Sequence, residues 1–170
     1  MNKRKRKKAE ALCSLGWDYY ENKDTAKALE CYLKAAKLND VWATYAVGLI
    51  YAKYSPFDEE YDDGIEQDYS KAVYWYRKSA ALGHQDAIKA LGHMYFEGKG
   101  VEQNYDEAFK YYKASDAKYW LGVCYARGLG VERNEHKAIE YLIEYMGSEY
   151  NGLITFERIC FNHETDPEDS

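Results

Sequence analysis

The side chains of this chain that could carry chemistry are its four cysteines and four histidines, since thiols and imidazoles are common nucleophiles and zinc ligands. Successive cysteines are separated by 18, 93 and 36 residues, so none has the short pair spacing of a zinc site. The histidines are scattered, without a recognisable catalytic pattern. We predict no enzyme activity, no metal and free thiols in a reducing compartment. These residues are Cys13, Cys31, Cys124, Cys160, His84, His93, His136 and His163.

Two further segments have a superficial likeness to ligand-binding loops. Gly98-Lys99-Gly100 has phosphate-loop glycines, but we expect it to follow a helix, and it lacks the Gly-Lys-Ser/Thr ending. In the acidic run from Asp58 to Asp68, taking Gly64 as the sixth position of a calcium loop puts Tyr61 third and Ser70 twelfth, where ligands are needed. We therefore expect no cofactor, and we interpret the acidic run as a solvated insertion.

The strongest pattern is a fourfold internal repeat. In each copy a glycine follows an apolar residue, stands five residues after an alanine and precedes a tyrosine by three: Ala11, Leu15, Gly16, Tyr19; Ala43, Val47, Gly48, Tyr51; Ala87, Leu91, Gly92, Tyr95; Ala117, Leu121, Gly122, Tyr125. A second block follows each: Asp24, Ala28, Tyr32; Asp68, Ala72, Tyr76; Asn104, Ala108, Tyr112; Asn134, Ala138, Leu142. Repetition at about 30 to 45 residues indicates a solenoid.

Each copy reads as two helices joined by a turn. Ala87, Leu91 and Tyr95 share one helix face, and Gly92 breaks that face. A glycine inside a helix costs about 1 kcal/mol, so its recurrence predicts a very close neighbouring helix. Asn104 with Glu107 three residues later predicts a capping box at the start of the second helix. By the same logic Asp24, Asp68 and Asn134 cap the other second helices.

These residues resemble the Sel-one-like repeat family, a relative of the tetratricopeptide repeats. The likeness rests on Ala87, Leu91-Gly92, Tyr95, Gly98-Lys99-Gly100-Val101, Asn104, Ala108 and Tyr111-Tyr112, on the matching run from Ala117 to Ala138, and on Lys71 to Ala80. It covers about residues 9 to 146. The resemblance implies an all-α, right-handed α/α superhelix and a scaffold or adaptor role.

We divide the chain accordingly. Residues 1–8 form a basic, flexible N-terminus, and 9–161 form the solenoid, with repeats at about 9–40, 41–84, 85–115 and 116–147 and a capping helix at about 149–161. Residues 162–170 form an acidic tail. The second repeat carries eight extra residues within 55–63, and six residues are missing between Tyr112 and Gly122 relative to the earlier junctions, so the stack must bend or tighten there.

By analogy with tetratricopeptide repeats, offsets −3, +1, +4 and +5 from each repeat glycine face a concave groove. The predicted partner-binding residues at these offsets are Trp17, Tyr20, Tyr45, Leu49, Lys53, Lys89, His93, Phe96, Tyr119 and Arg127. Large aromatics and arginine are typical anchors of binding surfaces. Lys53, Lys89 and Arg127 are candidates to clamp an acidic peptide or its terminal carboxylate. Alternatively, Trp17, Tyr45 and Phe96 only pack against neighbouring repeats.

Charge constrains the partner. The net charge is −6, but residues 3–8 are all basic, and the remainder has 17 basic against 29 acidic residues. An acidic body disfavours nucleic acid as a partner along the groove. We expect a cytoplasmic protein with no membrane segment that binds a protein or peptide; its oligomeric state stays open. Two alternatives also stay open: a small-ligand binder or enzyme with a site in the groove, and a nuclear or polyanion-associated adaptor that uses the basic N-terminus.

Overall fold

The computed structural model describes residues 3–53, 64–147 and 149–161, and these residues contain nine helices and no strand. The insertion at 55–63 and the tail at 162–170 lie outside the described residues. The helices are α1 (Lys3–Glu21), α2 (Thr25–Ala36), α3 (Val41–Ala52), α4 (Tyr69–Ala81), α5 (Gln85–Glu97), α6 (Tyr105–Ala114), α7 (Lys118–Arg127), α8 (Glu135–Met146) and α9 (Glu149–Phe161). The prediction of an all-helical fold is confirmed.

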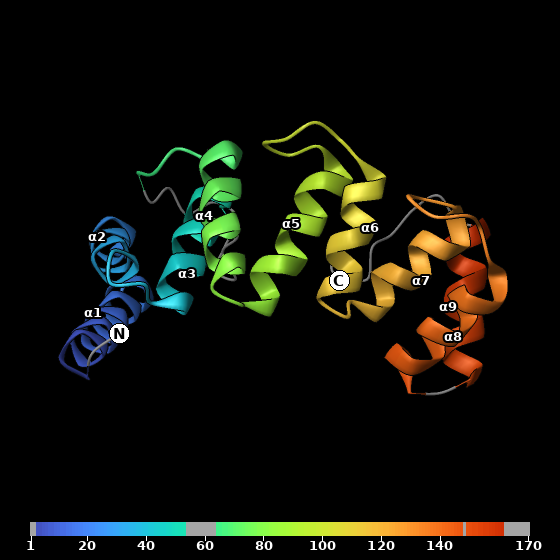
Figure 1. Ribbon diagram of the computed structural model, residues 1–170, viewed down its shortest axis with the longest axis horizontal. Coiled ribbons are helices and arrows are strands. Elements are labelled where there is room, and N and C mark those ends of the chain that lie inside the picture. The colour runs from blue at the N-terminus through green and yellow to red at the C-terminus, as the bar shows by residue number, and fades with distance from the viewer. Residues whose placement is uncertain (1–2, 54–63, 148, 162–170) are drawn as a thin grey trace.

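The helices form hairpins that follow one another along the long axis of the molecule. Figure 1 shows the row from α1 and α2 at one end to α7, α8 and α9 at the other. Within each hairpin the repeated alanine of the second helix is fully buried, as at Ala28 and Ala108. This arrangement is the predicted solenoid of four helical pairs with an additional C-terminal helix.

The repeated glycines make room for a large side chain of the partner helix. A Cβ atom at Gly16, Gly48 or Gly92 would lie 2.5–2.6 Å from a ring carbon of the tyrosine that follows in the second helix. In the fourth pair, a Cβ at Gly122 would lie 2.7 Å from Cγ of Leu142. The predicted close approach is therefore confirmed, and in three of the four hairpins it is an aromatic ring that occupies the space.

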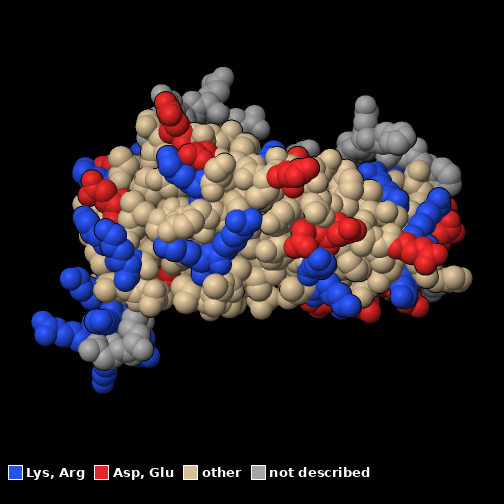
Figure 2. Space-filling view, turned by 45° about the horizontal axis from the view of Figure 1, so that its top comes forward, with Lys and Arg blue, Asp and Glu red and all other residues tan. Residues whose placement is uncertain are grey.

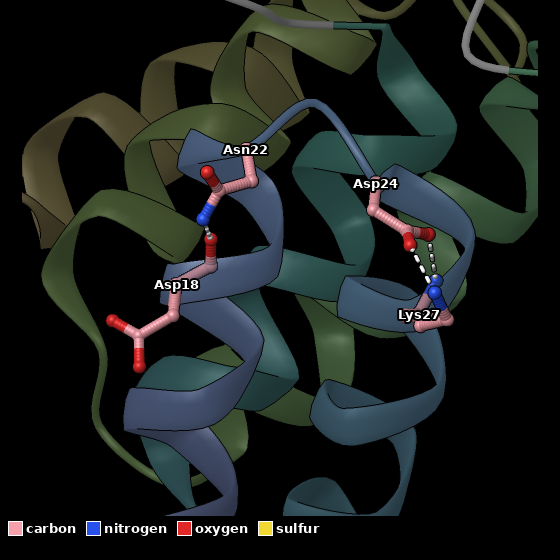
Figure 3. A network of polar contacts seen from close by, with 4 residues as sticks. All are labelled: Asp18, Asn22, Asp24 and Lys27. Carbon is pink, nitrogen blue, oxygen red and sulfur yellow. Dashed lines mark hydrogen bonds and ion pairs between the residues drawn. The ribbon is translucent and has the colours of Figure 1, made fainter.

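The second helix of every hairpin starts at the predicted cap. The side chain of Asp24, Asp68, Asn104 or Asn134 accepts a hydrogen bond from the backbone N–H three residues later. Figure 3 shows the first of these turns, in which Asp24 contacts Lys27 and the Asn22 side-chain amide donates to the Asp18 carbonyl at 2.7 Å. Capping side chains satisfy N–H groups that have no partner inside the helix.

The backbone N–H of each cap residue is bonded to the first helix of the same hairpin. Asp24 donates to the Tyr19 carbonyl, Asp68 to Tyr51, Asn104 to Tyr95 and Asn134 to Tyr125, in each case at 2.9 Å. Half of the capping box predicted at Asn104 is therefore absent, because its N–H already has the Tyr95 carbonyl. Glu107 instead forms an ion pair with Lys110, in which Oε1 lies 2.6 Å from Nζ.

The basic N-terminus is helical from Lys3, where α1 begins. Lysine and arginine are good helix formers, so the helix that starts the first repeat can extend through them. Arg6 and Glu10 also form an ion pair one turn apart at 3.3 Å. Residues 3–8 therefore form an exposed helical extension of the first hairpin.

Trp120 fills the shortened junction between the third and fourth hairpins. Its ring stacks on Tyr112 with centroids 5.5 Å apart and 16° between the planes. It lies two residues before the repeat glycine, where the other repeats have Ser14, Ala46 and Ala90. This junction is six residues shorter than the earlier ones, and the large Trp120 side chain packs there. Trp120 is only 7% exposed.

Candidate functional site: a groove along α3, α5 and α7

A cavity of about 600 Å³ opens between α3, α5 and the residues around them. Its wall includes five of the ten predicted partner-binding residues, at equivalent offsets from Gly48 and Gly92. The five are Tyr45, Leu49, Lys53, Lys89 and His93. The repeat therefore brings these side chains together, although up to 48 residues separate them in the chain.

A second cavity of about 400 Å³ lies between α5, α7 and α8. Lys89 and Tyr119 of the predicted set line it. Asp86, Lys89 and Trp120 belong to the walls of both cavities. The two cavities thus adjoin, and we refer to them together as the groove. The groove passes over the second, third and fourth hairpins.

Aromatic contacts hold the middle of the groove in place. His93 lies edge-on to Trp120 with centroids 4.7 Å apart, and its Nδ1 is 3.1 Å from the Tyr112 hydroxyl. Phe96 packs on Trp120 at 5.4 Å. Tyr112 also fills the space beside Gly92, where α5 packs on α6. The same tyrosine therefore joins these two helices and supports the wall of the groove.

Tyr45 is positioned by the turn before α5. His84 caps that helix, since its Nδ1 accepts from the Ala87 N–H at 3.4 Å, and its ring stacks on Tyr45 with centroids 4.5 Å apart. Tyr45 also lies 5.6 Å from the ring of Tyr76. A histidine at this turn therefore has a structural role and presents Tyr45 to the groove.

Charges of both signs line the groove. Glu97 pairs with Lys99 at 2.5 Å, and this hydrogen bond raises the pKa of Lys99. Lys118 pairs with Glu144, and that bond raises the lysine pKa in the same way. Within the described residues, Asp86 and Lys89 have no ion pair. The shared section of the groove therefore offers one anionic and one cationic side chain to an occupant.

The remaining predicted residues lie elsewhere or serve the fold. Trp17 is 44% exposed and packs against Tyr20 and Trp42, away from both cavities. Phe96 packs on Tyr105, Tyr112 and Trp120. Arg127 donates from Nε to the Ile159 carbonyl of α9 at 3.1 Å. Its guanidinium group therefore holds α9 and lies outside the two cavities.

Sequence reasoning missed two groove residues and one exposed tryptophan outside the two cavities. Trp42 is 38% exposed beside Trp17, while Asp86 and Trp120 line both cavities. Trp42 and Asp86 stand six residues before their repeat glycines, and Trp120 stands two before. None of these offsets belongs to the tetratricopeptide scheme. A large or charged residue that recurs at offset −6, as in Trp42, Asp86 and Asp116, is the signal that would have found the first two.

The exposed charges are basic at the N-terminal end of α1 and mixed over the rest of the visible face (Figure 2). Figure 2 shows lysine and arginine side chains gathered at the end of the molecule where α1 begins, and mixed charge over the rest of the visible face. Among the described residues, no helix is both long and apolar enough to cross a bilayer. No group of three or more histidine, cysteine or acidic side chains in the described part of the chain could hold a metal ion.

Comparison with known proteins agrees with this architecture. The model of a family described as Sel1 repeat matches residues 9–40, 43–84, 85–115 and 115–144. No curated protein matches the chain. A crystal structure of a protective antigen present in uropathogenic Escherichia coli strains, described as displaying an SLR fold, superposes with a TM-score of 0.71 at 28% identity. A Sel1 repeat protein from Oxalobacter formigenes superposes with a TM-score of 0.70 at 25% identity.

These matches cover 89% and 82% of this chain, but only 38% and 58% of the two solved proteins. The chain therefore spans about two fifths of the first relative and less than two thirds of the second. The family-model matches extend over all four helical hairpins, with the repeat glycine and the second-helix cap inside each match. This chain belongs to the Sel1 repeat family.

Proposed function

We propose that this chain is a non-enzymatic scaffold or adaptor that binds a peptide or a segment of a partner protein in the groove. The observation that supports this most is that side chains at equivalent repeat positions line adjoining cavities over three hairpins. An elongated surface of this kind suits a chain-like partner better than a compact substrate. Sel1 repeat proteins generally act as protein-interaction scaffolds.

The lining gives the proposed partner a chemical character. Leu49 and Tyr45 supply apolar contact area, while Lys53 and Lys89 supply positive charge in the larger cavity. An acidic side chain or a terminal carboxylate is attracted to cations of this kind. Because Arg127 is bonded to α9, the clamp proposed from the sequence is reduced to Lys53 and Lys89.

The test is affinity capture from the native host with the intact chain and two charge-reversed variants. Lys89→Glu reverses the charge of one groove cation, whereas Lys113→Glu makes the same change on the exposed surface of α6. We expect Lys89→Glu to lose the captured partner and Lys113→Glu to retain it, with unchanged helicity in both. Equal capture by the two variants would disprove binding in the groove.

The basic end of α1 supports a second candidate function. Residues 3–8 are exposed and carry six positive charges on about one and a half turns of helix. This cluster could recruit a polyanion to an otherwise acidic protein. Binding of heparin that is lost on deletion of residues 1–8 would support it, and absence of heparin binding by the intact chain would exclude it. The scaffold function goes with a cytoplasmic location. The polyanion-binding function goes with a nuclear location.

A further inference from the structure

The hydroxyl of Tyr32 is the one buried side-chain polar atom without a hydrogen-bond partner in the part of the chain that the structure describes. Tyr32 is only 2% exposed, and its ring fills the space beside Gly16. A buried hydroxyl normally has a partner, because leaving it without one costs the desolvation of the group with nothing in return. This hydroxyl therefore suits a partner that comes from outside the chain.

The equivalent tyrosine of the third hairpin shows where the Tyr32 hydroxyl points. Tyr112 and Tyr32 lie against their repeat glycines in the same way, with Cε1 and Cδ1 as the nearest ring atoms in both cases. The Tyr112 hydroxyl is 3.1 Å from Nδ1 of His93, which directly follows its repeat glycine. Trp17 has that place in the first hairpin. The Tyr32 hydroxyl is therefore directed to the face that carries Trp17.

The aromatic cluster around Tyr112 is closed, whereas the cluster around Tyr32 is open. Tyr112 stacks on Trp120, which is 7% exposed. In the first hairpin, Trp42 packs on Tyr32 with centroids 5.4 Å apart, and Trp17 lies 5.9 Å from Trp42. Trp17 and Trp42 are 44% and 38% exposed, and neither indole N–H donates to a described residue. We call Trp17, Trp42 and Tyr32 the tryptophan site.

The tryptophan site offers hydrogen-bond donors beside apolar ring surface. An indole N–H only donates, and a hydroxyl proton needs an acceptor, a role that a ring nitrogen of His93 can fill for Tyr112. Burial raises the pKa of Tyr32, and each titratable group that adds to this shift, Asp18 among them, is an anion when ionised. A carboxylate would be repelled there, so the acceptor that fits is a neutral carbonyl oxygen.

A proline-rich segment supplies such carbonyls together with apolar rings. In a polyproline II helix the backbone carbonyls make no internal hydrogen bonds, and proline has no N–H that would need an acceptor. The site lies on α-helices, whose own carbonyls are bonded within the helices. Any other extended segment would therefore leave its N–H groups without partners on this surface. Proline-rich segments also dock on aromatic surfaces in other recognition domains.

We propose that the tryptophan site binds a proline-rich segment of a partner protein. A backbone carbonyl of the segment accepts a hydrogen bond from the Tyr32 hydroxyl, and adjacent proline rings pack on Trp17 and Trp42. Because the hydroxyl is buried in the free chain, the exposed Trp17 ring turns aside when the segment binds. The walls of the two cavities include none of these residues, so this site is additional to the groove.

The probe is decaproline with blocked ends, titrated into the isotope-labelled full chain. Its controls are blocked peptides of the same length, one of alternating glycine and serine and one of alternating glycine and lysine. Binding is followed by the NMR signals of the four tryptophan indole N–H groups. We expect decaproline to give saturable shifts at Trp17 and Trp42 and none at Trp75 or Trp120, and the controls to give none.

A matched pair of tyrosine variants tests the hydroxyl. Tyr32→Phe removes a hydroxyl that has no partner, so the Tm of the free chain should stay the same or rise, while decaproline should bind about fivefold more weakly. Tyr112→Phe removes a hydroxyl that is bonded to His93, so the Tm should fall while decaproline binding stays the same. A purely structural role for Tyr32 would not produce this reversal.

A second pair of variants tests the rings. Trp17→Ala should weaken decaproline binding by about tenfold or more. Leu15→Ala changes another exposed apolar residue of α1 and should leave binding unchanged. Circular dichroism checks the fold of each variant, and Tyr32→Phe still tests the proposal if Trp17→Ala is unfolded.

Several outcomes overturn the inference: no saturable shifts with decaproline, equal binding of the glycine-serine peptide, or equal binding of decaproline by Tyr32→Phe and the parent. Tighter binding of the lysine peptide would assign the rings to a cation instead and overturn it as well. Loss of decaproline binding in Lys89→Glu would place the peptide in the groove. In that case the inference falls and the proposed function stands.

Discussion

The ring of Tyr112 occupies the position where any side chain at Gly92 would have to be: a Cβ there would lie 2.6 Å from the tyrosine Cε1. Tyr112 is fully buried, stacks on Trp120 and contacts His93, so the ring cannot easily move. One pair of residues thereby sets the distance between α5 and α6 and also supports the groove wall.

Gly92→Ala should consequently destabilise the fold despite the better helix propensity of alanine. The propensity gain is about 1 kcal/mol, and overpacking in a core costs about 1–3 kcal/mol. We expect a net loss of about 1 kcal/mol in the free energy of unfolding in urea. Gly122→Ala meets the aliphatic Leu142 side chain instead and should cost less. A Gly92→Ala variant as stable as its parent would contradict the account of the hairpin contact.

The cap at Asp68 should give the protein an acid-sensitive component of stability. Hydrogen bonds from the Lys71 backbone and side chain lower the pKa of Asp68 below its ordinary 3.8. The folded state therefore favours the carboxylate, and this contribution is present above 3.8 and lost as the pH falls through the lower folded-state value. Asp68→Asn retains a capping side chain, as at Asn104, but does not titrate.

Thermal unfolding should be measured from above pH 3.8 to below it. As the pH falls, the Tm should decrease less for Asp68→Asn than for the parent. Lys71 is solvent-exposed, so loss of its ion pair with Asp68 should matter little near neutral pH. Parallel Tm profiles for the two proteins would show that the Asp68 carboxylate is not linked to folding.

Cys13 should be a thiol protected first by burial and in addition by Asp40. Burial, followed by the charge of Asp40 and its hydrogen bond with the thiol at 3.7 Å, raises the pKa of Cys13 to about 12. Asp40→Asn keeps a cap for α3 but removes the charge, so the pKa of Cys13 should fall. Alkylation of Cys13, measured by mass spectrometry near pH 9, should become faster.

Cys124 supplies the internal control for this measurement. Burial alone raises its pKa to about 12, so its alkylation should not respond to Asp40→Asn. Faster alkylation of both cysteines would indicate general loosening of the fold, and no change at Cys13 would exclude the electrostatic explanation.

Arg127 should determine how firmly α9 is held. Arg127→Ala removes the bond to the Ile159 carbonyl and should cost about 1 kcal/mol. Amide hydrogen exchange in the last turn of α9 should accelerate, while that in α1 stays the same. Arg133→Ala, which removes an exposed ion pair with Glu135, should change stability by less than about 0.5 kcal/mol. Unchanged exchange in α9 would contradict the role given to Arg127.

The parts of the structure that follow from the sequence are those that the repeat determines locally. Gly92 and its equivalents, the caps such as Asn104, and the burial of Ala108 depend on contacts within one hairpin. Groove residues such as Leu49 and Lys89 were also predictable, because equivalent offsets on stacked helices face the same way. Sequence spacing is sufficient to predict a contact wherever that contact recurs in each repeat.

The parts that were not predictable arise where the repeat is broken. Trp120 enters the groove because the third junction is short, and no other repeat has a large residue at that offset. Arg127 occupies a groove offset but is bonded to α9, and Val123 is buried in the same apolar cluster as Ile159 of α9. The packing of α9 follows from the end of the array and not from the repeat. The helical start at Lys3 likewise depends on propensity beyond the repeated pattern.

The bond from the cap N–H to the tyrosine carbonyl closes each hairpin at the same two points, whatever lies between them. Tyr19 and Asp24 are five residues apart, whereas Tyr51 and Asp68 are seventeen apart, and both pairs make the bond at 2.9 Å. Lengthening that connection therefore leaves the helices in register. The rim of the array that carries these connections is thus free to diversify through evolution, or by engineered grafting of new loops, while the paired helices keep their geometry.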